Sequence, residues 1–136
     1  MVSGVFDTMS HQMDWQVHMI EHQIGAYTDC AHGMGLAAVS LPYYRMIYSF
    51  GLDKFVRFAT EIWGISPDGK SKDEIGLDAL EALEAFTKEC GIVTSIKQLG
   101  ATEEMLPDIT NSTIIFGNGY KQLNADDILR ILEECY

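Results

Sequence analysis

The chain has 136 residues, of which 47% are hydrophobic and 21% charged, and its formal net charge is −11. This balance is typical of one globular domain with a substantial core. The negative charge disfavours binding to nucleic-acid phosphate or anionic membrane surfaces, and no apolar run reaches the roughly 18 residues of a membrane span. Three cysteines without a CxxC spacing indicate reduced thiols. We therefore expect a soluble, cytoplasmic protein that binds neither nucleic acid nor membrane.

All four histidines lie in the first quarter of the chain. Residues 2–26 contain no proline and are predicted to form one or two helices. Side chains four residues apart share a helix face, so Asp7/His11 and His18/His22 are pairs of the kind that first-row metals bind. A polar helix face that binds no metal is the alternative interpretation.

The spacing of the two pairs limits how they can share an ion. On one continuous helix, His11 and His18 would lie about 10.5 Å apart along the axis, at about 1.5 Å per residue. Metal–ligand bonds are only about 2 Å long. One ion would therefore reach both pairs only if the helix breaks near Asp14-Trp15, or if a second chain contributes.

The next segments alternate turns and apolar helices. Residues 27–32 are predicted to be a connection that places His32 at the start of a helix. Residues 36–50 form an apolar helical stretch in which Pro42 is expected to kink or restart the helix, and Gly51 to end it. Three tyrosines here either line a substrate cleft or pack in the core: Tyr43, Tyr44 and Tyr48.

A helical hairpin is predicted for the middle of the chain. Residues 52–63 have the i, i+3, i+4, i+7 pattern of a core-facing helix, and residues 66–69 form a turn by composition. Ser71 and Glu74 match a capping box that opens a helix. The expected core-facing residues of the two helices are Leu52, Phe55, Val56, Ala59, Ile62, Trp63, Leu77, Leu80, Leu83 and Phe86.

The last third of the chain is predicted to contain two shorter helices. Thr102 is expected to cap one that stops before Pro107. Residues 108–118 are predicted as helix or coil, although residues 113–116 have strand-like propensity without a partner strand. Asn124 is expected to cap the final helix.

The motifs together resemble a known family. DxxxH, followed by HxxxH and AHGxGLA, reads here as GVFDTMSH and DWQVHMIEHQIGAYTDCAHGMGLA. This wording resembles the metal-ligand signature of the iron-containing (group III) alcohol dehydrogenases, in particular their butanol-dehydrogenase branch. The resemblance covers essentially the whole chain. It implies an all-α helix bundle of the family's C-terminal, dehydroquinate synthase-like type, as a single domain over residues 1–136.

The resemblance also implies roles for individual residues. The family's divalent metal, iron or zinc, would be held by Asp7, His11, His18 and His32. The family's additional active-site histidine, which takes part in proton transfer, matches His22. The complete family enzyme passes a hydride between NAD(P) and a small alcohol or aldehyde.

The sequence departs from the family pattern in two ways. The nucleotide-binding domain with its Gly-rich phosphate turn is missing. Only six residues separate His11 from His18, where the family has several helices, and the junction falls near Met13-Asp14. We therefore expect no dehydrogenase activity from the chain alone, and a homo-oligomer formed through uncovered apolar surface. The alternatives are a non-catalytic helical remnant or interaction module that self-associates, and a small metal-binding protein.

Overall fold

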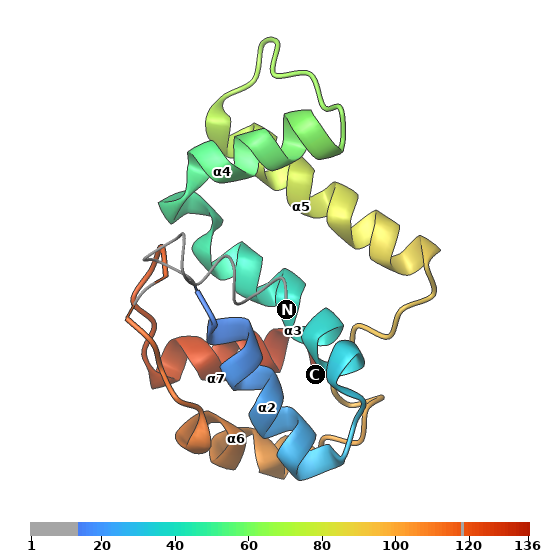
Figure 1. Ribbon diagram of the computed structural model, residues 1–136, viewed down its shortest axis with the longest axis vertical. Helices are drawn as coiled ribbons and strands as arrows, with labels where there is room; N and C mark the ends of the chain where they lie inside the picture. Colours follow the sequence, from blue (N-terminus) through green and yellow to red (C-terminus); the bar gives the residue numbers. More distant parts are fainter. Residues whose placement is uncertain (1–13, 118) are drawn as a thin grey trace, which may run out of the picture.

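The computed structural model describes residues 14–117 and 119–136, and within these ranges every regular element is a helix (Figure 1). This confirms the predicted all-α fold. None of the described helices is long and apolar enough to cross a membrane. The elements are α2 (Gln16–Thr28), α3 (His32–Ile47), η1 (Tyr48–Phe50), α4 (Leu52–Arg57), η2 (Phe58–Ile62), α5 (Lys72–Glu89), η3 (Glu103–Met105), α6 (Leu106–Ser112) and α7 (Ala125–Glu134).

The helices form two parts. We call α2, α3, α6 and α7 the body, because α3 packs against α2 and α7, and α6 against α2 and α7. We call α4, η2 and α5 the hairpin, which extends from the body beyond the end of α3 (Figure 1). Three fully buried residues of the hairpin form a small cluster of their own, Ala59, Ile75 and Ala79. The main core contains Ile20, Ile24, Ala38, Val39, Tyr43, Ile47, Phe55, Leu80, Ile96, Ala101, Leu106, Ile109, Leu123, Ile128, Ile131, Leu132 and Cys135.

A tight connection between α2 and α3 positions the candidate site. Helix α2 ends at Thr28, and the C-cap residue Asp29 has a left-handed φ of 56°, a conformation that aspartate tolerates better than most residues. Ala31 is extended, and α3 begins at His32, as predicted. The turn brings α3 back against α2, so the first residue of α3 lies beside the middle of α2.

One prediction about the α3–α4 region was wrong. Helix α3 continues through Pro42 to Ile47, so of the two alternatives for Pro42 the restart does not occur. Ile62, expected in the core, is 65% exposed. The reason lies in η2, a π-helical segment whose wider turn holds an extra residue and so rotates the following side chains away from the predicted face.

The predicted capping box at Ser71 and the predicted cap at Asn124 are confirmed, and the second cap is also a capping box. Ser71 and Glu74 cap α5, and Asn124 and Asp127 cap α7, each with the reciprocal pair of side-chain-to-backbone hydrogen bonds. The buried face of α5 differs from the predicted one, because it is centred on Ile75 and Ala79 and leaves Leu77 and Phe86 exposed.

The segment around α6 also differs from expectation. Pro107 lies in the first turn of α6, where its missing N–H is tolerated, so the predicted helix end before Pro107 was wrong. Residues 113–116, which have strand-like propensity, pair with no strand among the residues that the structure describes. Instead, the buried amide of Gln16 donates to the Ile114 carbonyl and accepts from the Phe116 N–H, at 3.0 and 2.8 Å. This side chain fastens the start of α2 to the C-terminal part of the chain.

Candidate metal centre

Three histidines meet where α2 and α3 pack together. His18 and His22 lie one turn apart on α2, and their ring centroids are 6.2 Å apart. His32, the first residue of α3, lies 5.5 Å from each of these rings. Two imidazoles on one tetrahedral ion, with bonds of about 2 Å, have ring centres roughly 5 to 6 Å apart. The spacing of His32 from His18 and from His22 fits a shared divalent metal, whereas His18 and His22 lie slightly farther apart than this range.

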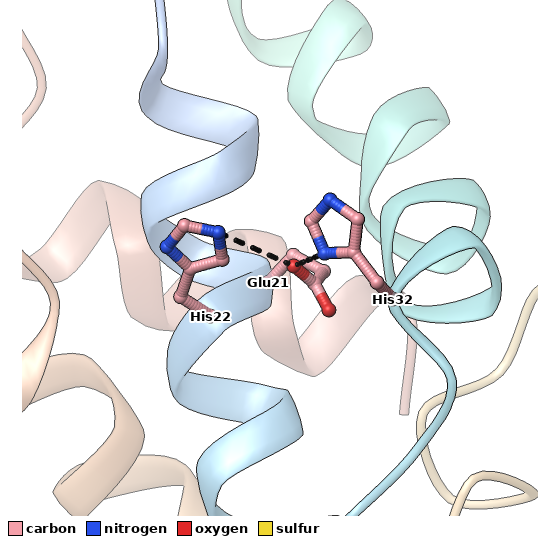
Figure 2. Close-up of side chains that lie close together, drawn as sticks. All are labelled: Glu21, His22 and His32. Carbon is pink, nitrogen blue, oxygen red and sulfur yellow. Dashed lines mark ion pairs between the residues drawn. The ribbon is translucent and has the colours of Figure 1, made fainter.

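A buried carboxylate, Glu21, lies beneath two of these imidazoles. Its side chain is only 2% exposed, whereas those of His22 and His32 are 53% and 54% exposed. Glu21 Oε2 contacts His32 Nδ1 directly and lies 4.0 Å from His22 Nε2, so both rings face one carboxylate oxygen (Figure 2). Potential ligand atoms of Glu21, His22 and His32 all lie within 4.8 Å of one another, and two imidazoles with a carboxylate are a common metal donor set.

Glycine makes room for this carboxylate. A Cβ built on Gly35 of α3 would lie 2.8 Å from Glu21 Cγ and 3.0 Å from Glu21 Oε1, with Cys30 Sγ at 3.3 Å. On α2 itself, a Cβ on Gly25 would lie 3.5 Å from Glu21 Oε1. The close approach of α3 at Gly35 thus gives Glu21 its burial.

The environment of His18 differs from that of the other two histidines. Its pKa is lowered, first by burial and then by the neighbouring His32 and His22. A lowered pKa favours the neutral imidazole, which is the form that ligates a metal. His18 contacts the Trp15 ring, with centroids 4.8 Å apart, and it faces a cavity.

The cavity beside His18 has a volume of about 450 Å³. Its wall is mostly apolar, and two of the three tyrosines considered for a cleft, Tyr43 and Tyr44, line it. The Tyr43 hydroxyl donates to Asp14 Oδ2 at its edge. Burial, and then this hydrogen bond, raise the pKa of Tyr43 well above its usual range, so the phenol stays protonated. The lining residues are Asp14, Val17, His18, Leu36, Ser40, Tyr43, Tyr44, Ile47, Lys54, Phe55, Phe58 and Tyr120.

The structure thus brings together three of the five predicted site residues, His18, His22 and His32. The other two, Asp7 and His11, lie outside the described residues. Sequence reasoning missed Glu21, because a spacing of four selects the His18/His22 face and Glu21 lies about 100° from His22 around the helix. The only available signal was an acidic residue inside a histidine-rich helix, and its burial depends on α3.

The described residues thus form an all-helical domain with three histidines where two helices cross, which is an arrangement suited to metal binding. The model of the Fe-containing alcohol dehydrogenase family, C-terminal region, matches residues 5–136, and the chain belongs to this family.

The relatives include butanol dehydrogenases, lactaldehyde reductase and 1,3-propanediol dehydrogenase. NADH-dependent butanol dehydrogenase A of Clostridium acetobutylicum is 29% identical, over 90% of this chain and 32% of its own length. The probable NADH-dependent butanol dehydrogenase 1 of Bacillus subtilis is 28% identical, over 93% of this chain and 33% of its own length. The crystal structure of NADH-dependent butanol dehydrogenase A from Thermotoga maritima matches with a TM-score of 0.78 and 29% identity. The match covers 90% of this chain and 33% of that structure's chain. The chain therefore spans about a third of the relatives it matches.

Proposed function

We propose that this chain is the metal-binding part of an NAD(P)-dependent alcohol dehydrogenase that interconverts primary alcohols and aldehydes. The observation that carries this proposal is the convergence of His18, His22 and His32, with ring centroids 5.5 to 6.2 Å apart, beside an apolar cavity. The butanol dehydrogenases among the relatives support the substrate class.

The family motif assigns the metal ligands. Asp7, His11, His18 and His32 would hold iron or zinc, and the bound ion would supply Lewis-acid polarisation of the alcohol or aldehyde oxygen. His22, with half of its side chain exposed, remains for proton transfer, since an imidazole can both donate and accept a proton.

The cavity supports a substrate with an alkyl chain. Val17, Leu36 and Phe55 provide apolar wall next to His18, so an alkyl group placed there leaves its oxygen beside the histidines. The hydride step needs NAD(P), and we propose that its binding site comes from a nucleotide-binding part outside these 136 residues. This agrees with the observation that the chain matches only about a third of the length of its NADH-dependent relatives.

Two measurements on the purified chain test this proposal. Equilibrium dialysis should find one Zn²⁺ per chain, and His32→Ala should abolish tight binding because it removes a ligand. Incubation with butanal and NADH or NADPH should give no more turnover than His22→Ala does. Failure of the wild-type chain to bind Zn²⁺ would contradict the metal centre, and butanal reduction above the His22→Ala level would contradict the need for a second part.

We also propose a homo-oligomer in a reducing, cytoplasmic setting. All three cysteines are free thiols. Large apolar side chains are exposed on and beside the hairpin, including Phe50 at 57%, Ile62 at 65% and Phe86 at 49%. Exposed apolar surface favours association. Light scattering at micromolar concentration should detect dimers or larger assemblies, and a monodisperse monomer would contradict this.

A further inference from the structure

We propose that Glu21 is a positioning residue for the metal centre. In this arrangement Glu21 Oε2 accepts a hydrogen bond from His32 Nδ1–H and thereby leaves His32 Nε2 free to bind the ion. The inference rests on the proposed function, because it assigns a role within the same centre, but it concerns a residue to which the HxxxH motif gives no role.

The first support is the burial of the carboxylate. Glu21 is 2% exposed, and no group of the described residues hydrogen bonds its Oε2. A buried carboxylate oxygen without a donor is costly, by about 1–3 kcal/mol or more for a charged group. The neighbour able to supply a proton at contact distance is His32 Nδ1. In the proposed arrangement, a proton on His32 Nδ1 supplies the donor that this buried oxygen otherwise lacks.

The second support is the geometry of the contact. Glu21 Oε2 lies in direct contact with His32 Nδ1, so this nitrogen faces the carboxylate, where a proton on it can be donated. The second nitrogen of His32 points away from Glu21 in Figure 2. A ligating histidine whose other nitrogen donates to a carboxylate is oriented and made more basic by it.

The third support is that the surroundings hold Glu21 in place. Gly35 and Gly25 leave the space that its carboxylate occupies, with the built Cβ atoms at 3.0 and 3.5 Å from Oε1. His22 Nε2, at 4.0 Å from Oε2, faces the same oxygen from the α2 side. A carboxylate fixed between two helices can align the first residue of α3 with the histidines of α2.

The test reads the imidazole directly, in the metal-free chain. Long-range ¹H–¹⁵N NMR should show the His32 proton on Nδ1 in the wild type and in Glu21→Gln, whose amide oxygen still accepts. In Glu21→Leu, which removes the acceptor but keeps the volume, the proton should move to Nε2. An Nε2–H tautomer in the wild type would overturn the proposal, whether or not the chain binds metal.

Zn²⁺ affinity provides the second reading. Glu21→Leu should weaken binding about 10- to 100-fold, the effect typical of losing such a partner, and Glu21→Gln should retain most of the affinity. Glu89→Leu, at an exposed position on α5, gives the same change in net charge and should bind as the wild type does. Circular dichroism and thermal melting verify that each variant is folded.

The remaining outcomes separate three possibilities. Equal, large losses in Glu21→Gln and Glu21→Leu would mean that Glu21 is itself a ligand, which overturns the proposal. Unchanged affinity in Glu21→Leu would mean that it only fills space, which also overturns it. Absence of Zn²⁺ binding in the wild type would refute the proposed function, and the tautomer measurement would still decide the role of Glu21.

Discussion

The body and the hairpin are both helical, but they are stabilised differently. The body encloses Ile20, Ile24 and Ile131 completely, and its helices α2 and α3 carry His18, His22 and His32. The hairpin has a small cluster of its own, and one polar atom within it, Trp63 Nε1, is buried without a hydrogen-bond partner among the described residues. The comparison teaches that the candidate metal centre depends on the better-packed part, whereas the hairpin contributes Phe55 and Phe58 to the wall of the cavity.

The largest expected effect comes from removing core volume in the body. Ile24→Ala should lower the free energy of unfolding by about 2–5 kcal/mol, because Ile24 of α2 is fully enclosed and leaves a cavity. Ile75→Ala in the hairpin should fall at the low end of that range, since its small cluster can collapse around the missing atoms. Urea unfolding followed by circular dichroism measures both values. Equal losses would show that the two parts are packed equally well.

A smaller effect is expected where α3 crosses Glu21. Gly35→Ala should destabilise the chain by about 1–3 kcal/mol, since the added Cβ would lie 2.8 Å from Glu21 Cγ in a buried contact. Gly33→Ala is the matched control on the same helix. Its Cβ meets nothing within 4 Å, so it should stabilise α3 by up to about 1 kcal/mol. Thermal unfolding of both variants measures these changes in stability. A stabilising effect of Gly35→Ala would contradict the close packing of α3 against Glu21.

The smallest effect distinguishes the capping boxes of the two parts. Asp127→Asn should cost about 1 kcal/mol, because Asp127 in the body accepts from the Asn124 N–H and pairs with Lys121. Glu74→Gln should cost less, since Glu74 in the hairpin is fully exposed. Chemical unfolding at neutral pH measures the loss of stability in each variant. A larger loss of stability in Glu74→Gln than in Asp127→Asn would contradict this prediction.

The pH dependence sharpens the same prediction. Burial alone would raise the pKa of Asp127, but Lys121 and the Asn124 N–H outweigh it, and the net pKa lies below the ordinary 3.8. The stabilisation is therefore fully present above pH 3.8 and is lost as the pH falls through the lower pKa of the folded state. Asp127→Asn should remove this part of the acid sensitivity. The free energy of unfolding of the wild type and the variant, measured as a function of pH, tests this. If the two values differed by the same amount at every pH, the acid sensitivity would not come from Asp127.

Local patterns were predictable from the sequence, and tertiary ones were not. Ser71 and Asn124 were identified as caps because a capping box depends on residues within one turn. The exposure of Ile62 escaped prediction because the π-helical η2 changes the register without a periodicity signal. At the candidate metal centre, the family motif supplied His18, His22 and His32. The role of Glu21 could not be predicted, because its burial depends on the close approach of Gly35, and that approach depends on how α2 and α3 pack together.

The buried amide of Gln16 has a consequence for how the chain folds during synthesis. It joins residues 98 and 100 positions later, Ile114 and Phe116, to the first turn of the helix that bears His18. Contacts between such distant segments form slowly, and on the ribosome they must wait until the later segment has emerged. Helix α2, which carries His18 and His22, therefore gains this anchor only after residues 114–116 have been synthesised.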